Sequence, residues 1–278
     1  MTGQSLPLPF TPPVALTIAG SDSGGGAGIA ADLKTFAAHG VFGTLAITAI
    51  TAQDTAGVHN AIPVDPSLLD AQIDAVLGDF PVSVAKTGML ATLELLELII
   101  DRVKTKRLPP LVVDPVMVST SGAALFEGDA AAAYRRLLPY ALVLTPNLPE
   151  AEALLGTRVK YLSDMRDAAK ALHDLGPQVV VVKGGHLPGP RAVDVVAGGG
   201  ELLELGFPMV QTRNVHGSGC TLSAAIAANL ALGYSPVDSV RRARVFVTDA
   251  IVRSSNWVLG SGHGPLDHFG AVVPRGRH

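Results

Sequence analysis

Short apolar runs alternate with longer helical patterns through most of this chain, and this alternation constrains the fold more than any single motif. Residues 14–19 form an apolar run typical of a strand, and a helical pattern follows from residue 29 to about residue 39. Strands that alternate with helices build a mostly parallel sheet that packs between helices. We therefore predict an α/β fold with a mostly parallel central sheet and helices on both faces.

The same patterns locate the remaining predicted elements. Residues 192–197 and 202–207, joined by three glycines, indicate a β-hairpin. We predict the other strands at residues 46–51, 82–85, 111–113, 142–144 and 179–182, and the other helices at residues 68–77, 93–103, 130–138, 218–232 and 236–254. No repeat or linker interrupts them, so residues 14–278 are predicted to form one domain. Residues 1–13 contain several prolines and no basic n-region, which predicts a flexible tail and not a signal peptide.

Composition and charge exclude several classes of partner. The chain has 278 residues, of which 48% are hydrophobic and only 5% aromatic, so its core must consist mainly of Ala, Val, Leu and Ile. No stretch approaches the ~20 apolar residues that cross a bilayer. The formal net charge of −3 provides no basic field for nucleic acid. The single cysteine excludes an internal disulfide and fits a reducing compartment. We expect a cytoplasmic protein that binds neither membranes nor nucleic acid.

Polar residues stand where several predicted strands end. Asp114 directly follows the strand at 111–113, and Lys183 with two glycines follows the strand at 179–182. Sheets of this class bind ligands beyond the carboxyl ends of their strands. Asp114 is therefore a candidate for the chemistry, and Lys183 could contact a phosphate or simply enter a turn. Gln53 could hydrogen-bond a planar heterocycle or cap a turn.

Three other polar residues each allow two interpretations. Asn147 and Glu150 are three residues apart at a predicted helix start, so with Asp114 they could supply oxygen ligands to Mg²⁺ held largely through water. Alternatively, Asn147 caps this helix and Glu150 occupies its first turn. Asp32 follows the glycine-rich loop at residues 20–28, and its side chain could face a ligand or solvent.

Residues 214–221 open an Ala-rich helical pattern with Gly217, Ser218, Gly219 and Cys220. The free N–H groups and the positive dipole end of a helix form a ready anion site. The dipole also favours the thiolate of a cysteine on the first turn, so Cys220 could act as a base or a nucleophile. The alternative is a small residue that packs at the start of a helix.

Residues 26–31 match the dinucleotide fingerprint G-x-G-x-x-A, with Asp54 at a suitable distance. That fingerprint begins at the end of a strand, whereas Gly26 comes several residues after the strand at 14–19, so the match is weak. An NAD(P)H-dependent oxidoreductase would also leave the Cys220 stretch without a purpose. No G-x-x-x-x-G-K-[ST] phosphate loop is present.

The chain carries five ordered motifs, at residues 19–22, 32–36, 147–150, 183–186 and 217–220. These motifs resemble those of the hydroxymethylpyrimidine and phosphomethylpyrimidine kinases of thiamine biosynthesis, which have the ribokinase-like fold. The resemblance extends from about residue 14 to residues 262–265, nearly the whole chain.

The resemblance implies transfer of the γ-phosphoryl group of ATP, with Mg²⁺, to a hydroxymethylpyrimidine and then to its monophosphate. It implies that Cys220 is the catalytic base and that the backbone amides of Gly217, Ser218, Gly219 and Cys220 form the anion hole. Lys183 and Gly219 would contact the ATP phosphates, with Asp114 near the transferred group. Asn147, Glu150 and Asp114 would hold the metal and its waters.

The resemblance also implies a pyrimidine site and a homodimer. The positions that match the family's pyrimidine contacts are Gly20, Asp32, Thr51, Gln53 and Met89. Asp32 and Gln53 could pair with the ring nitrogen and the amino group, and Met89 would supply an apolar contact. Relatives more often have Val where this chain has Thr51, which leaves the polarity of the pocket open.

Two alternatives remain within the same fold. A kinase for pyridoxal or pyridoxine would also phosphorylate a hydroxymethylated heterocycle. A non-catalytic nucleotide-binding protein is disfavoured, because each expected catalytic position is occupied by the expected residue.

Overall fold

The computed structural model describes residues 10–117, 126, 129–185 and 189–270. Its strands are β1 (Val14–Ala19), β2 (Phe42–Ile47), β3 (Ala49–Gln53), β4 (Val58–Pro63), β5 (Val82–Thr87), β6 (Leu111–Val113), β7 (Ala141–Leu144), β8 (Val179–Val182), β9 (Arg191–Gly198) and β10 (Glu201–Pro208). Its helices are α1 (Gly28–Ala38), α2 (Pro66–Asp79), α3 (Leu93–Lys104), α4 (Ala130–Leu137), the 3₁₀ turn η1 (Leu138–Tyr140), α5 (Leu148–Leu155), α6 (Leu162–Asp174), α7 (Ser218–Ala231) and α8 (Pro236–Ser254). Residues 1–9 of the predicted tail and His186 lie outside the described residues.

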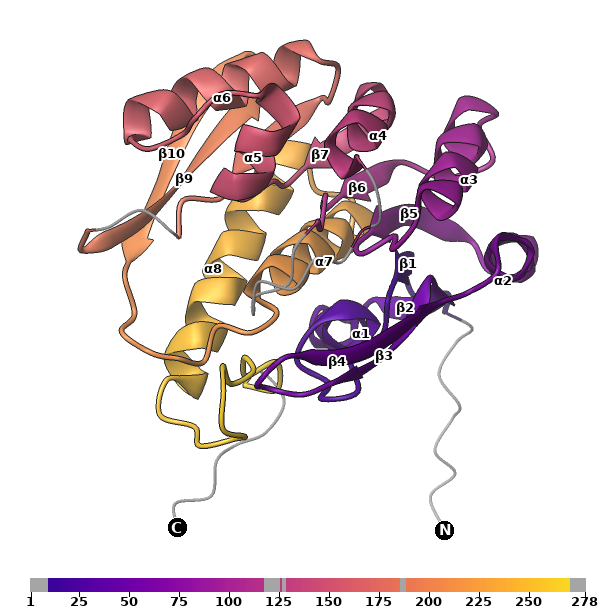
Figure 1. Ribbon diagram of the computed structural model, residues 1–278, viewed down its shortest axis with the longest axis horizontal. Helices are drawn as coiled ribbons and strands as arrows, with labels where there is room; N and C mark the ends of the chain where they lie inside the picture. The colour runs from indigo at the N-terminus through magenta and orange to yellow at the C-terminus, as the bar shows by residue number, and fades with distance from the viewer. Residues whose placement is uncertain (1–9, 118–125, 127–128, 186–188, 271–278) are drawn as a thin grey trace, which may run out of the picture.

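An eight-stranded sheet organises the fold, in the order β10-β9-β8-β7-β6-β5-β1-β2 (Figure 1). Every neighbouring pair from β8 to β2 is parallel, whereas β9 is antiparallel to β8 and β10 is antiparallel to β9. The prediction of a mostly parallel sheet with a terminal hairpin is confirmed.

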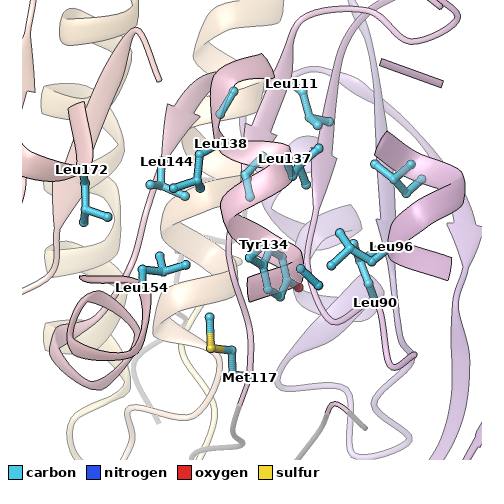
Figure 2. Packing of buried hydrophobic residues seen from close by; sticks show 14 of the residues in the cluster. Leu90, Leu96, Leu111, Met117, Tyr134, Leu137, Leu138, Leu144, Leu154 and Leu172 are labelled. Carbon is cyan, nitrogen blue, oxygen red and sulfur yellow. The ribbon is translucent and has the colours of Figure 1, made fainter. Parts of the chain in front are cut away.

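Helices cover both faces of this sheet, as predicted, because successive strand residues point to opposite sides. In β8, Val180 and Val182 pack toward the layer of α2 to α6, while Val179 and Val181 pack toward α1, α7 and α8. Figure 2 shows part of the first layer, where Leu96 of α3, Tyr134 of α4 and Leu154 of α5 are labelled. Among the described helices, none is long and apolar enough to cross a membrane.

The single strand predicted at residues 46–51 is wrong. Strand β2 ends at Ile47, and β3 begins at Ala49 and pairs with β4 in a separate two-stranded sheet. Buried Thr48 separates them: its N–H donates to the Ala19 carbonyl (3.0 Å) and its hydroxyl to the Met89 carbonyl (2.6 Å). The residue pattern does not change between β2 and β3, so the sequence gives no sign that one strand ends and another begins. The break depends on the tertiary hydrogen bonds of Thr48.

Two elements were not predicted. Strand β4 is polar and almost entirely exposed, so it carries no alternating apolar signal. Helix α6 does carry such a signal, because Met165, Ala168, Ala169 and Leu172 are buried at helical spacing.

Helix α7 brings its first turn to the carboxyl edge of the sheet. Residues 221–229 are all buried, and most of their side chains are small, which lets the helix pack closely against its neighbours. Figure 1 shows α7 lying alongside α8. The residue before α7, Gly217, has φ 78°, and a Cβ there would clash with the Gly26 carbonyl oxygen. A glycine is therefore required where the start of α7 meets the loop after β1.

Asp22 holds the glycine-rich loop after β1 in shape. One carboxylate oxygen accepts from the N–H groups of Gly26 (3.0 Å) and Ala27 (2.8 Å), and the other accepts from Gly24 (2.8 Å). The Nε2 atom of His216, just before α7, lies 2.8 Å from the carboxylate. Burial would raise the pKa of Asp22, but the hydrogen bonds and charge of His216 and the amides outweigh it and lower the pKa.

A first prediction concerns the packing of helix α3. Replacing the fully buried Ile99 by Ala should reduce the free energy of unfolding by about 2–5 kcal/mol, because it leaves a cavity. Leu93→Ala on the same helix is the control: Leu93 is 45% exposed, and its loss should be under about 1 kcal/mol. Urea denaturation measures both, and equal losses would contradict the described packing.

A second prediction concerns Asp22. Asp22→Ala should reduce the free energy of unfolding at neutral pH by about 1–3 kcal/mol, because the loop amides lose their acceptor. A carboxyl group with a lowered native pKa stabilises the fold above its unfolded pKa and loses this effect as the pH falls through the native pKa. The difference between the two proteins should therefore narrow below pH 3.8, the ordinary value. Denaturation at a series of pH values tests this, and a pH-independent difference would contradict it.

Candidate active site

The predicted site residues gather at the carboxyl edge of the parallel strands. Gly20 follows β1, Asp114 follows β6, and Lys183 follows β8. Met89 comes shortly after β5, and the first turn of α7 carries Cys220. Parallel strands end on the same side of a sheet, so residues far apart in the sequence meet here.

Lys183 and Asp114 form the centre of one half of this edge. The ammonium group lies 2.9 Å from Asp114 Oδ1 and 3.8 Å from Glu150 Oε2. The hydroxyls of Thr145 and Ser223 each donate to the Asp114 carboxylate at 3.1 Å. A Cβ on Gly219 would lie 3.2 Å from the Lys183 ammonium, so this cation stands directly over the first turn of α7.

The charges in this half depend on one another. Burial would raise the pKa of Asp114, but Lys183, Lys86 and hydrogen bonds lower it. Burial would lower the pKa of Lys183, but the two carboxylates raise it above its usual range. Burial and the Asp114 charge raise the pKa of Glu150 to about 7, although Lys183 opposes the shift. Lys183 and Asp114 therefore form a charged pair at neutral pH, and burial holds the pKa of Glu150 above its ordinary value.

Asn147 and Glu150 form a capping box at the start of α5. Asn147 Oδ1 accepts from the Glu150 N–H (2.9 Å), and Glu150 Oε2 accepts from the Asn147 N–H (2.7 Å). Among the described residues, no group of three or more His, Cys, Asp or Glu side chains could hold a metal ion. The Asp114 and Glu150 carboxylates already accept hydrogen bonds from protein groups. They are therefore better placed to bind the water molecules of a hydrated metal ion than to coordinate the ion directly.

The other half of the edge contains Gly20, Met89, Gln53 and His216. A Cβ on Gly20 would clash with the Met89 methyl group, so the thioether lies against the Gly20 backbone. The side-chain nitrogen of Gln53 lies 3.5 Å from His216 Nε2, and the same Nε2 atom lies 2.8 Å from the Asp22 carboxylate, so His216 stands between these two side chains. Sequence reasoning missed this role of His216, because an isolated histidine has no local signal.

Thr51 uses its polar groups within the protein. Its hydroxyl donates to the Ser21 carbonyl (2.8 Å), and its N–H donates to the Ser21 hydroxyl (2.9 Å). These bonds tie β3 to the glycine-rich loop. In this structure, Thr51 therefore does not offer a free donor to a ligand.

The interpretation of Asp32 as a solvated helix residue is wrong. Asp32 is fully buried, and its Oδ2 accepts from the Thr17 hydroxyl (2.6 Å) and from the Lys86 ammonium (2.8 Å). Asp32 exposes no surface to a ligand. Lys86 is a residue that sequence reasoning missed, although a lysine inside the apolar strand β5 is itself a signal that it needs a buried anion.

Cys220 lies on the first turn of α7, where the Gly28 N–H donates to its sulfur. Burial raises the pKa of this thiol to about 11; Lys86 and the Gly28 amide lower it, while Asp32 and Asp114 raise it. Desolvation therefore outweighs the favourable charge and amide at this sulfur, and the role of Cys220 as a base stays a prediction.

Comparisons with known proteins agree with this geometry. The family model for phosphomethylpyrimidine kinase matches residues 22–267. The hydroxymethylpyrimidine/phosphomethylpyrimidine kinase of Synechococcus elongatus is 48% identical over 92% of this chain and 97% of its own length. A crystal structure of an ADP complex of Bacillus subtilis pyridoxal kinase is 41% identical, with a TM-score of 0.85 over 93% of this chain and 98% of that chain.

One relative is much longer than this protein. The chloroplastic thiamine biosynthetic bifunctional enzyme of Arabidopsis thaliana is 49% identical over 92% of this chain, which spans only 50% of that enzyme. The fold is thus ribokinase-like, as predicted, and the dinucleotide-fingerprint interpretation of residues 26–31 is wrong. The sequence motifs, the shared edge of the sheet and the similarity along nearly the whole chain lead to one conclusion: this protein is a kinase that belongs to the phosphomethylpyrimidine kinase family.

Proposed function

We propose that this protein phosphorylates 4-amino-5-hydroxymethyl-2-methylpyrimidine with ATP and then phosphorylates the resulting monophosphate to the diphosphate. The observation that carries the proposal is the position of Cys220 at the start of α7. It stands on the helix whose first turn Lys183 covers, and its sulfur meets Gly28, which lies against the Gly20 backbone. ATP bound near Lys183 and a pyrimidine ring bound near Gly20 would therefore both lie close to this sulfur.

The first transfer needs alignment, charge neutralisation and a proton acceptor. The substrate's hydroxyl oxygen attacks the γ-phosphorus, and the bond from that phosphorus to the ADP oxygen breaks. The hydroxyl proton passes to the Cys220 thiolate. The backbone amides of residues 217–220 and the Lys183 ammonium stabilise the charge on the transferred phosphoryl group.

Mg²⁺ is part of this proposal as the companion of ATP. Asp114, Asn147 and Glu150 would hold its waters, because the two carboxylates already bond to protein groups and Mg²⁺ retains much of its hydration. When bound, the ion would neutralise part of the negative charge on the ATP phosphates.

For the pyrimidine, we propose that Gln53 bonds the ring nitrogen and amino group while Met89 and the Gly20 backbone contact the ring. The His216 imidazole, whose Nε2 donates to the Asp22 carboxylate, lies beside the Gln53 amide. Thr51 supports the loop rather than the ligand. Asp32, proposed from the sequence as a direct contact, is fully buried and would not touch the ring.

Phosphorus NMR of the protein with ATP, Mg²⁺ and the hydroxymethylpyrimidine tests the proposal. A pyrimidine monophosphate should appear first and a diphosphate second. A parallel sample with pyridoxal tests the activity named for the Bacillus subtilis relative. Phosphorylation of pyridoxal alone would show that the substrate is a vitamin B6 compound. Phosphoryl transfer in neither sample would contradict the proposal. A homodimer stays a prediction from the family resemblance, and a cytoplasmic location stays a prediction from the composition of the chain.

A third prediction concerns the base. Cys220→Ala should lower turnover of the hydroxymethyl transfer by ~10²-fold or more, because no group would take the hydroxyl proton. The dissociation constant for ATP should remain close to that of the wild type. Steady-state kinetics measures the turnover, and a separate nucleotide-binding experiment measures the dissociation constant. Wild-type turnover in this variant would show that Cys220 is not the base.

A fourth prediction concerns ring recognition. Gln53→Ala should raise the KM for the pyrimidine by about tenfold or more, the effect of one lost hydrogen bond in a partly buried site. The KM for ATP should change little and serves as the internal control. If both KM values rose together, Gln53 would have a structural role and no specific contact with the ring.

A further inference from the structure

A buried ion pair stands next to the site and takes no part in the steps described above. Lys86 and Asp32 both have no exposed surface, and their charged atoms lie 2.8 Å apart. Among the described residues, the second oxygen of Asp32 has no hydrogen-bond partner. Removing two charges from water costs several kcal/mol for each ion. Such a pair is weak evidence for a purely structural role, because apolar residues of similar volume often replace buried ion pairs without loss of stability.

The pair spans three elements that meet beneath the site. Lys86 lies on β5 opposite Thr17 of β1, and the Thr17 hydroxyl and the Lys86 ammonium share one oxygen of Asp32 on α1. A Cβ on Gly88 would lie 3.0 Å from the Lys86 ammonium. The ammonium group therefore reaches the backbone next to Met89, which we assign to the ring site.

Helix α1 connects the pair to Cys220. The Gly28 N–H at the start of α1 donates to the Cys220 sulfur, and Asp32 follows one turn later and holds Lys86. The charged groups that act on this sulfur are Lys86 of β5, Asp32 of α1, Asp114 after β6 and Lys183 after β8. Lys86 affects the thiol more strongly than Asp32 does, so the cationic end of the pair dominates at the sulfur.

We propose that Lys86, oriented by Asp32, is a positioning residue for phosphoryl transfer: it is the buried cation that stabilises the thiolate of Cys220. This inference rests on the proposed function, in which that thiolate takes the hydroxyl proton. Lys86 remains charged for this role, because Asp32 and Cys220 outweigh the effect of burial and raise its pKa. After the transfer, Cys220 is a neutral thiol and releases its proton to solvent.

The two proposed transfers differ in their need for this cation. A hydroxyl group must lose a proton as it attacks, so the first transfer requires the thiolate. A phosphate monoester has a second pKa of about 6 and is already ionised at neutral pH. The second transfer therefore requires no base. Loss of Lys86 should impair the first transfer much more than the second.

The fifth prediction uses the single cysteine of the chain as a reporter. Only the thiolate reacts with iodoacetamide, so at about pH 8 the alkylation rate measures the thiolate fraction of Cys220. Lys86→Met should alkylate at least about tenfold more slowly than the wild type, the effect of one unit of pKa. The double variant Asp32→Asn/Lys86→Met leaves no unpaired buried charge, and it should also react more slowly than the wild type.

Arg102→Met is the matched control. Arg102 is a buried cation on α3 that pairs with Asp70 and Asp74 of α2, on the other face of the sheet. Its removal should leave the alkylation rate of Cys220 within about twofold of the wild type. Circular dichroism and thermal melting establish which variants are folded.

Kinetics of the two transfers complete the test. In the Lys86 variants the hydroxymethyl transfer should fall at least about tenfold, and transfer to the monophosphate should stay within about threefold of the wild type. Equal falls in both transfers, or wild-type alkylation in a folded Lys86 variant, would overturn the proposal. If the wild type performs neither transfer, the proposed function fails, and the alkylation result then stands as a separate measurement of the thiolate.

Discussion

The close contact between the start of α7 and the glycine-rich loop is the constraint on which the rest of the site depends. Gly217 adopts a left-handed conformation and lies against the Gly26 carbonyl, while His216 meets the Asp22 carboxylate. These contacts place the free N–H groups of α7 at the carboxyl edge of the sheet. Without them, the residues after β1 and those before α7 would not face one another, because nearly 200 residues of chain separate them.

Two lysines, of which Lys86 is fully buried and Lys183 partly exposed, then determine the charge of the site. Lys183 pairs with Asp114 over the first turn of α7, and Lys86 pairs with Asp32 beneath it. Both cations oppose the desolvation that raises the pKa of Cys220 to about 11. In a region of low dielectric, the balance between burial and these few charges decides whether the sulfur can accept a proton. The proton affinity of Cys220 therefore depends on charges from several strands and helices and not on one motif.

Most of the elements and many of the site positions follow from local patterns. The apolar run of β8, the capping residues of α5 and the glycines before Cys220 each have a short-range physical cause, and the structure contains them where they are predicted. The exceptions have long-range causes. Thr48 divides an apolar run through hydrogen bonds to Ala19 and Met89, and Asp32 lies in the interior because Lys86 is there to receive it.

The α/β class, the parallel sheet with its terminal hairpin and the family can be predicted from periodicity and short motifs, because these are properties of neighbouring residues. Which charges are paired and which are buried depends on contacts between distant parts of the chain. Asp32 and Lys86 are 54 residues apart, and Asp114 and Lys183 are 69 apart. The cost of burying a charge depends on the partner that the fold supplies, and no local pattern contains that partner.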